Sequence, residues 1–585
     1  MRLRYSPNFL AIFFILFFSA FALKDLAKPG FYTSHDGETH TARIAQYYQA
    51  LYDGQLPPRW AKTLNGGLGS PIFVYIYPAP YFLGSLAHIL GLSFVSSFKV
   101  LMAASFIASG IFSYLWLKEV FKRTSAAFIG AMFYTWAPYK FSLIYVRASL
   151  SEALAYAFLP LFLFAVARLA VKTNLANIAF SALTLSFFFL SQNLVVLMAA
   201  PVIFLYILVL AYLRKSVIYL FAAAHVFLWA GAISSVTYLP TFFERKEIHL
   251  QELFMQVYKS HFVTISQLIH SPWGYGFDLP GIVNDQISFQ IGLAHILVVI
   301  AGVVILTYIL VLKKVSFFKK LQELILENNL TGSDKILPAF FLIVFVVSVF
   351  LTLENPYSKF VWNTIKPLQL IDIPWRFLGI ASLSAAFLAG FLAKIFKPRI
   401  FLLLMLAALL VANRNHLKIN KSSFYDDNFF LNYHGSATQF NEFTPRTRYS
   451  TGVTDDFVSP VESIKGNIKI YDFNKKSNEV SFKTQNTYPA RIQVNLIQFS
   501  GWRILMDGKN FTNDKSLVNK SFSFAYRPNV DTSGLYDLIV PAGNHQFTFK
   551  LEETKLRKTA NYLSLSSFLL ACVAIVLKRK RIVNF

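Results

Sequence analysis

Long apolar runs recur along the whole chain and set the main constraint on its fold. A helix needs about 20 apolar residues to cross the roughly 30 Å hydrocarbon core of a bilayer. Of the 585 residues, 55% are hydrophobic and only 15% are charged, which is too little polar surface for a soluble protein of this length. The sequence therefore predicts a polytopic α-helical membrane protein.

Twelve apolar stretches are predicted to span the membrane. They are 7–23, 95–117, 124–138, 151–170, 176–190, 194–213, 217–239, 287–312, 335–353, 374–394, 399–413 and 561–577. The stretch 71–92 is ambiguous, because counting it as a span reverses the side of every later loop. Its three prolines, Pro71, Pro78 and Pro80, favour an interrupted helix on the outer surface. That choice places the Lys- and Arg-rich loops and both termini in the cytoplasm, as the positive-inside rule favours.

The N-terminus, the net charge and the single cysteine narrow the class of protein further. Residues 1–22 resemble a signal peptide with a small-residue cleavage site at Ala20-Phe21-Ala22; we favour a retained first helix. The net charge of +25 comes largely from short basic clusters between apolar runs, which indicates topology rather than nucleic-acid binding. Cys572 is the only cysteine, so an internal disulfide and a cysteine-based metal site are excluded. The expected location is the plasma membrane.

Three regions differ in composition. Residues 1–413 form the predicted transmembrane domain, whose first outer loop is 24–94. Residues 414–560 are polar, and stretches such as NEVSFKT and ARIQVNLIQF alternate apolar and polar side chains between turn-forming segments. This pattern predicts an antiparallel β-sandwich domain outside the cytoplasm. Residues 561–585 supply a last span and a basic cytoplasmic tail.

The segment FYTSHDGETHTAR, residues 31–43, concentrates ionisable side chains in an apolar chain. Ser34 or Asp36 could cap a helix running from about residue 37 to residue 52. Acidic residues are favoured at a helix start by capping and by the helix dipole. In that interpretation Asp36 and Glu38 only stabilise the start of the helix.

The spacing of the same residues offers a functional alternative. Asp36, His40 and Arg43 recur at i, i+4 and i+7, which places an acid, an imidazole and a cation on one helix face. Such a face beside the membrane predicts a polar pocket. His35, Asp36, Glu38 and His40 could also bind a divalent cation such as Mg²⁺ or Mn²⁺, although their spacing matches no specific metal signature.

Several motifs, in order along the chain, carry a family resemblance. The segments are 35–84, 137–160 (APYKFSLIYVRASLSEALAYAFLP), 371–379 (IDIPWRFLG), 499–509 (FSGWRILMDGK) and 540–554. They resemble the GT-C superfamily of membrane glycosyltransferases, and within it a bacterial subgroup labelled YfhO-like or 6-pyruvoyl-tetrahydropterin synthase-related. The second label implies no pterin chemistry here, because the sequence has no three-histidine zinc pattern.

The resemblance implies a GT-C-like fold and transfer of a sugar at the outer membrane face during cell-envelope assembly. The donor would be a polyprenyl-phosphate-linked sugar, and the acceptor a glycan, lipid or protein. The family's acidic residue in the first outer loop, a general base or metal ligand, matches Asp36, with Glu38 as second choice. A carboxylate that takes the proton of the attacking hydroxyl lowers the barrier, and arginines stabilise the phosphate that leaves.

Cations and aromatic residues on the predicted outer side complete the candidate site. The donor phosphate-binding candidates are Arg376, Arg147, Arg43 and Lys140, and the substrate-binding candidates are His35, His40, Glu152, Trp273, Tyr275, Asp372 and Trp375. Alternative interpretations remain open. Arg147 could form a structural ion pair with Glu152, Arg376 could extend to the membrane interface, and the two loop aromatics could anchor that loop.

Two other classes of protein compete with a glycosyltransferase. A lipid or glycan transporter usually buries ionisable residues within its spans; here His225 and His295 are the main examples, and simple packing explains each. A non-enzymatic envelope assembly protein would bind a partner through its β-domain. In that domain Trp502, Tyr526 and Tyr536 could hold an acceptor glycan, which would give the domain an accessory role, although core packing is the favoured interpretation of Trp502.

Overall fold

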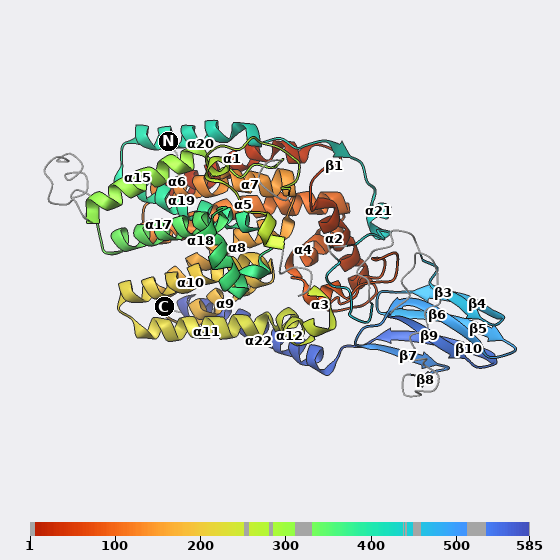
Figure 1. Cartoon of the computed structure of the whole chain (residues 1–585). Helices are drawn as coiled ribbons and strands as arrows, with labels where there is room; N and C mark the ends of the chain where they lie inside the picture. The colour runs from red at the N-terminus through yellow and green to blue at the C-terminus, as the bar shows by residue number, and fades with distance from the viewer. Residues whose placement is uncertain are drawn as a thin grey trace, which may run out of the picture.

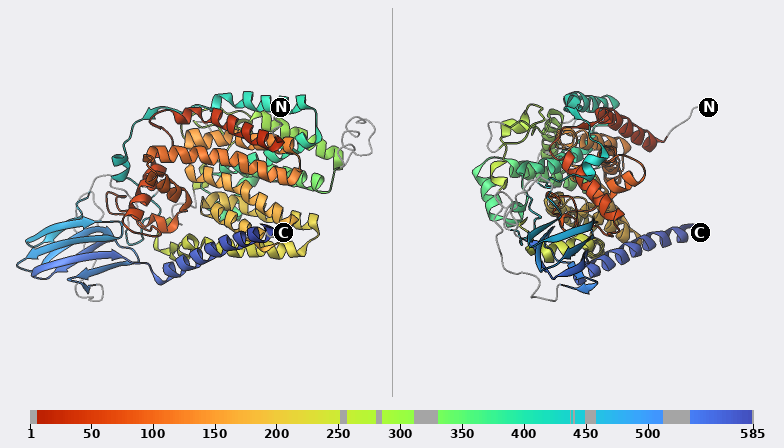
Figure 2. Two further views of the ribbon diagram at one scale, coloured as in Figure 1. Left: turned by 180° about the vertical axis from the view of Figure 1, so that it is seen from behind. Right: turned by 90° about the vertical axis from the view of Figure 1, so that its right-hand side faces the viewer.

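The computed structural model describes residues 6–250, 257–279, 285–310, 330–436, 438, 441–448, 458–511 and 534–583. Helices lie side by side in a bundle, and a β-rich unit projects from one end (Figure 1). The first outer loop lies at that same end, and both chain termini lie on the far side (Figure 2). A helical membrane protein with a C-terminal β region is the predicted fold class, and the structure confirms it.

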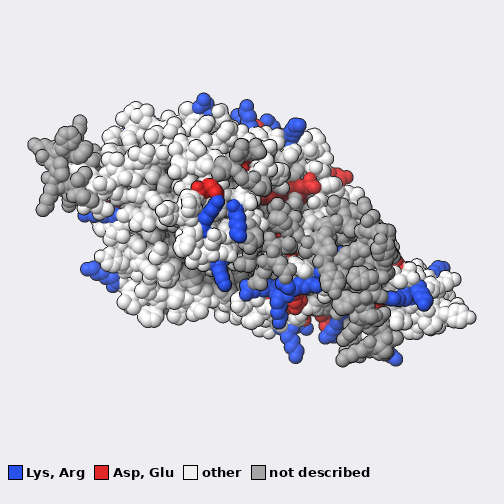
Figure 3. Space-filling model, viewed as in Figure 1, with Lys and Arg blue, Asp and Glu red and all other residues white. Residues whose placement is uncertain are grey.

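Every predicted span contains a helix. These helices are α1 (Pro7–Ala22), α5 (Phe94–Phe121), α6 (Thr124–Thr135), α8 (Leu150–Val171), α9 (Leu175–Phe189), α10 (Asn193–Arg214), α11 (Val217–Ile233), α15 (Leu293–Leu310), α17 (Ser333–Thr352), α19 (Leu378–Ile395), α20 (Arg399–Asn413) and α22 (Lys555–Val583). Within the described ranges, eight helical segments have the length and hydropathy to cross a membrane. On the face shown in Figure 3, charged side chains leave large areas of the bundle uncovered, as lipid contact requires.

Some predicted spans are shorter than a membrane is thick. α1 and α9 are apolar but have 16 and 15 residues. α6 has 12 residues and would measure about 18 Å. It ends because Pro138 begins a separate short helix, α7 (Pro138–Phe141).

The predicted span 217–239 is wrong in its second part. α11 ends at Ile233, and the helical segment Ser235–Glu247 turns away from it by 76°. The first helix of that segment, α12 (Ser235–Glu244), packs against α22 and α3 (Ile72–Tyr75), and the Thr241 hydroxyl donates to the Val74 carbonyl at 3.2 Å. The apolar pattern of 217–239 predicts one continuous helix, but contacts with the first outer loop favour a bend after Ile233.

The ambiguous stretch 71–92 is interrupted, as its prolines predicted. α3 is separated from α4 (Ala79–Ile89) by an extended residue, Ile76. α4 exposes Phe82, Leu86 and Ile89. A short helix with an exposed apolar edge suits contact with lipid at a membrane surface.

The C-terminal β region consists of two antiparallel sheets. Its strands are β3 (Val461–Lys465), β4 (Ile468–Lys475), β5 (Glu479–Asn486), β6 (Ala490–Ile497), β7 (Trp502–Met506), β8 (Lys509–Asn510), β9 (Leu535–Val540) and β10 (Gly543–Leu551). The sheet orders are β4-β5-β10-β7-β8 and β3-β6-β9. Alternate side chains of β5 are buried from Val480 onward, which is the predicted period of two. Phe482 of β5 and Phe547 of β10 are paired in one sheet, and their rings stack with centroids 5.3 Å apart.

The sheets occupy only the later part of the block 414–560. The earlier part runs back over the first outer loop, where β2 (Ser422–Ser423) pairs with β1 (Phe31–Tyr32). α21 (Asp427–Leu431) then contacts α2 (Gly37–Tyr52). This part of the chain, which contains β2 and α21, is the covering segment. Its polar composition resembles that of the sheets, so composition alone did not separate the two.

The first outer loop also shares a hydrophobic core with the sheets. Trp60 and Trp502 meet edge to face at 5.4 Å, and both are buried. Tyr536 is buried in the same core. Trp502 is packed in the core, as predicted, whereas the prediction that Tyr536 holds a glycan is wrong because the same core buries it. Tyr526 lies outside the described residues.

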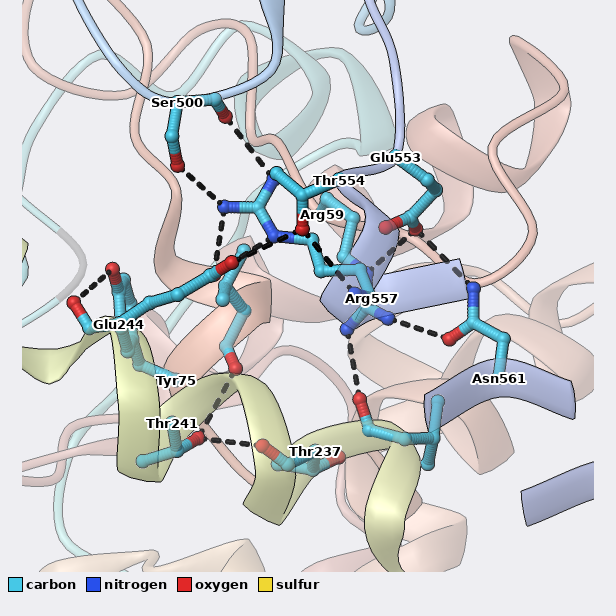
Figure 4. Close-up of polar contacts among 12 residues, drawn as sticks. Arg59, Tyr75, Thr237, Thr241, Glu244, Ser500, Glu553, Thr554, Arg557 and Asn561 are labelled. Carbon is cyan, nitrogen blue, oxygen red and sulfur yellow. Dashed lines mark hydrogen bonds and ion pairs between the residues drawn. The ribbon is translucent and has the colours of Figure 1, made fainter. Parts of the chain in front are cut away.

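Two buried arginines join the outer parts of the chain (Figure 4). Arg59 of the first outer loop donates from Nε to Glu553 at 2.9 Å and from Nη2 to Asn561 of α22 at 2.7 Å. Arg557 of α22 donates from Nε to Glu244 of α12 at 2.9 Å. These contacts fix the first outer loop and the β region relative to the bundle.

Replacing Arg557 with Ala is expected to destabilise the protein. Arg557 is fully buried, and its loss would leave the buried Glu244 carboxylate without its ion-pair partner. Breaking such a pair costs roughly 3 kcal/mol, which a thermal melt of the purified protein would detect. Arg503→Ala is the matched control, because the Arg503–Glu552 pair is largely exposed and contributes little. Equal melting temperatures for the two variants would contradict this assignment.

Candidate functional site

A cavity of about 750 Å³ lies between the first outer loop, the segment 257–279 and the 3₁₀ helix η7 (Pro374–Phe377). Eight predicted site residues line it: His35, Asp36, His40, Arg43, Arg147, Asp372, Trp375 and Arg376. Residues from distant parts of the sequence therefore meet in one polar cavity at the end of the bundle that carries the β region.

Backbone contacts fix the position of Asp36. Its N–H donates to the Arg147 carbonyl at 2.8 Å, and the N–H of His35 donates to the Val146 carbonyl at 3.1 Å. A Cβ on Gly37 would lie 2.5 Å from Oγ of Ser34 and 2.9 Å from Cζ of Phe31, so a larger residue at the start of α2 would require both side chains to shift. This close approach holds Asp36 against the end of the segment Ser142–Arg147, a π-helix.

The capping interpretation of Asp36 does not explain its side chain. α2 runs over Gly37–Tyr52, as predicted, but the Asp36 side chain makes no capping hydrogen bond. The carboxylate is 43% exposed, and its Oδ2 atom lies 3.8 Å from Nη2 of Arg147. Asp36 is therefore available to a ligand in the cavity.

Two arginines share one buried carboxylate beneath the cavity. Glu152, at the first turn of α8, is fully buried; its Oε2 accepts from Nη1 of Arg147 at 2.6 Å and from Nη1 of Arg376 at 2.7 Å. The Tyr139 hydroxyl donates to the other oxygen, Oε1. Nη2 of Arg376 donates to Asp372 at 2.7 Å. The predicted Arg147–Glu152 ion pair is present, and Arg376 joins it.

The resulting network alternates in charge along Asp36, Arg147, Glu152, Arg376 and Asp372. A guanidinium has five N–H donors, so binding to Glu152 orients each arginine without using all of its donors. The Nε atom of Arg376 is buried and has no hydrogen-bond partner in the described structure. The arginines retain donors that an anionic ligand could accept from.

Arg43 and His40 meet at Tyr81. Nη1 of Arg43 donates to the Tyr81 hydroxyl at 2.8 Å, and that hydroxyl lies 3.2 Å from Nδ1 of His40. Burial lowers the pKa of His40 well below its ordinary value, and the charges of Arg43 and Arg147 add to the effect. His40 is therefore a neutral acceptor, and Arg43 supplies the positive charge on this wall.

His35 is held by aromatic packing. Its ring stacks on Phe277 at 4.3 Å, and its Nε2 lies 3.4 Å from the carbonyl of Tyr275. Burial lowers the pKa of His35; Arg147 adds to that effect and Asp36 opposes it. A neutral His35 shapes the wall next to Asp36.

Several predicted site residues lie outside the cavity lining. Glu38 faces the covering segment, where it accepts from the Tyr425 hydroxyl at 3.4 Å. Lys140 is buried above the rings of Tyr134 and Tyr156, at 4.2 and 4.8 Å from their centroids. Glu38 and Lys140 therefore do not face the same space as Asp36.

The two loop aromatics hold the segment 257–279 in place. The ring of Trp273 packs on His416 at 4.4 Å, and the Tyr275 hydroxyl donates to the Lys418 carbonyl at 2.8 Å. Neither side chain lines the cavity. Phe277, from the same loop, does line it.

The predicted metal ligands Asp36, Glu38 and His40 are not gathered. Glu38 points to Tyr425 and His40 to Tyr81. In the part of the chain that the structure describes, no group of three or more His, Cys, Asp or Glu residues could hold a metal ion. These three residues therefore do not form a preformed metal site.

His261 and Asp278 also line the cavity, and neither was predicted from the sequence. Nδ1 of His261 lies 2.8 Å from Oδ2 of Asp278, and that oxygen accepts from Nε1 of Trp375 at 2.9 Å. One signal was available, because Asp278 is the only acidic residue in the aromatic segment HSPWGYGFDLPG, residues 270–281.

The two intramembrane histidines make backbone contacts only. Nε2 of His295 lies 2.9 Å from the Phe133 carbonyl, and Nδ1 of His225 lies 2.7 Å from the Phe221 carbonyl. Both contacts agree with the packing interpretation of these residues.

No protein-family model matches the sequence, and no curated protein sequence matches it. A solved structure that matches the fold is the cryo-EM structure of arabinofuranosyltransferase AftD from Mycobacteria, with a TM-score of 0.35 and 13% identity. The match covers 69% of this chain and 26% of that chain, so this chain spans about a quarter of the structure it matches. A likeness at this level carries no argument about activity.

Proposed function

We propose that this protein is a GT-C-type membrane glycosyltransferase. It would move a sugar from a polyprenyl-phosphate-linked donor to a glycan, lipid or protein acceptor at the outer face of the membrane. One observation carries the proposal: the Asp36 carboxylate, which caps no helix, faces a polar cavity beside Arg147 and Arg376, and Glu152 fixes both arginines. A base beside fixed cations suits a reaction in which phosphate leaves.

In the proposed reaction, Asp36 takes the proton of an acceptor hydroxyl while the hydroxyl oxygen attacks the anomeric carbon. The bond between that carbon and the phosphate oxygen breaks, and its electron pair stays on the phosphate. Arg147 and Arg376 donate charge-assisted hydrogen bonds to the phosphate, and these strengthen as negative charge develops. Arg43, which also lines the cavity, is the further candidate cation. Glu152 acts as a positioning residue because it is buried beneath the cavity.

The proposal also assigns roles to the three regions. Residues 1–413 would carry the catalytic cavity, and the β-sheets an accessory role in holding the outer loop. The last helix would anchor the sheets to the bundle, with both termini in the cytoplasm.

Turnover by the purified full-length protein tests the proposed function. Protein in lipid nanodiscs is mixed with polyprenyl-phosphate sugars of several kinds, and release of polyprenyl phosphate is followed by thin-layer chromatography. We expect release from at least one donor and none with boiled protein. If the folded protein binds these donors and releases no polyprenyl phosphate, even with added membrane glycans as acceptors, a non-enzymatic binding protein is the better account.

A further inference from the structure

Three histidines line the cavity, and their surroundings differ. His35 and His40 are surrounded by aromatic rings and arginines, which keep them neutral. His261 instead faces the carboxylate of Asp278 at 2.8 Å. Of the histidines in the described cavity lining, His261 is the one paired with an acid.

Asp278 is held in place by the rest of the site. Its Oδ2 atom accepts from Nε1 of Trp375 as well as facing His261. The Trp375 ring lies 5.2 Å from the guanidinium carbon of Arg147, the residue that also faces Asp36. His261, Asp278, Trp375 and Arg147 thus form one continuous set of contacts across the cavity wall.

We propose that His261, held as an imidazolium by Asp278, binds a phosphate group of the ligand together with Arg147 and Arg376, and makes phosphate binding depend on pH. This inference rests on the proposed function in one respect only, namely that the bound phosphate belongs to a polyprenyl-linked sugar donor. It goes beyond that function because it assigns a titrating cation that the proposed sugar transfer does not require.

The geometry leaves His261 free to do this. Nδ1 of the ring lies 2.8 Å from Oδ2 of Asp278, an ion-pair contact without hydrogen-bond geometry, so no hydrogen bond in the described structure occupies this buried nitrogen. A carboxylate this close to the ring favours a proton on both ring nitrogens, so Nε2 is a donor. An imidazolium donor to a phosphate oxygen makes a charge-assisted hydrogen bond.

Nearby charges decide the sign of the pH dependence. Burial lowers the pKa of His261, but Asp278, with added effects from Asp372 and Asp285, outweighs burial and raises that pKa above its ordinary value. Burial would raise the pKa of Asp278, but the interaction with His261, with smaller effects from Trp375 and the facing cation Arg147, lowers that pKa below its ordinary value. His261 is therefore charged at low pH, and phosphate binding should weaken as pH rises through its pKa.

The test uses farnesyl phosphate as a probe without sugar, bound to the full-length protein in nanodiscs between pH 5.5 and 8.5. Wild type should bind more tightly at the acidic end. His261→Gln should bind at least about tenfold more weakly there and lose that preference. His261→Lys should restore binding and keep it nearly constant over the range, because the lysine stays charged. Asp278→Asn should move the midpoint to lower pH.

A second His–Asp pair provides the matched control. His545 and Asp507 lie 2.7 Å apart in the β region, far from the cavity lining, so His545→Gln should leave the binding curve unchanged. If His261→Gln keeps the wild-type pH dependence, or if Gln and Lys at 261 weaken binding equally at every pH, the inference is overturned. The binding probe carries no sugar, so this test is independent of sugar transfer. If farnesyl phosphate binds with the expected pH dependence but no polyprenyl-phosphate sugar is consumed in the turnover assay, only the proposed function is contradicted.

Discussion

Replacing Asp36 with Asn is expected to lower the rate of sugar transfer by about 10²–10⁴-fold, the usual effect of losing a general base. The protein should still fold, because Asn keeps the size of the side chain and Asp36 makes no capping bond that could be lost. Donor binding should remain, since Arg147 and Arg376 are held by Glu152 rather than by Asp36. Rates of polyprenyl-phosphate release and a thermal melt would measure both effects.

Glu38→Gln is the matched control for Asp36→Asn. Glu38 lies two residues away on the same helix but faces Tyr425, outside the cavity lining. We expect this variant to keep most of the wild-type rate. A normal rate for Asp36→Asn with a slow Glu38→Gln would move the base to Glu38 and contradict the assignment made from the cavity.

Replacing Glu152 with Gln is expected to destabilise the protein by about 3–5 kcal/mol, since it breaks a buried ionic network. Arg147 and Arg376 would lose the carboxylate that both now share, and their like charges would repel. Donor binding should fall together with the melting temperature, because the two guanidinium groups would no longer be fixed.

Asp472→Asn serves as the control for this loss. The Asp472–Lys483 pair lies on the surface of the β region, with side chains 60% and 46% exposed, so its removal should leave the melt unchanged. A Glu152→Gln protein with a wild-type melting temperature and wild-type donor affinity would show that the shared carboxylate positions nothing.

Sequence patterns predicted much of the fold where the structure depends on residues that are close together in the chain. Apolar length located the helices, and the spacing of Asp36, His40 and Arg43 located one wall of the cavity. α2 has the predicted ends because the turn and the polar residues that set them are contiguous in sequence. Prolines in 71–92 likewise act on their own neighbourhood.

Contacts between distant segments could not be predicted in this way. Glu152 and Arg376 are 224 residues apart, and no periodicity connects them. His261 and Asp278 were missed for the same reason, since their pairing depends on how a loop folds back to Trp375. Core packing was predicted for Trp502, but its packing partner, Trp60, lies in another region of the chain and could not be identified from the sequence.

A cryo-EM structure of the Asp36→Asn protein with a polyprenyl-phosphate sugar tests the central claim most directly, because the variant should bind the donor without consuming it. We predict that the phosphate lies within hydrogen-bond distance of Arg147 or Arg376 and that residue 36 faces the anomeric carbon from the acceptor side. Donor density elsewhere, with this cavity empty at saturating donor, would contradict the account.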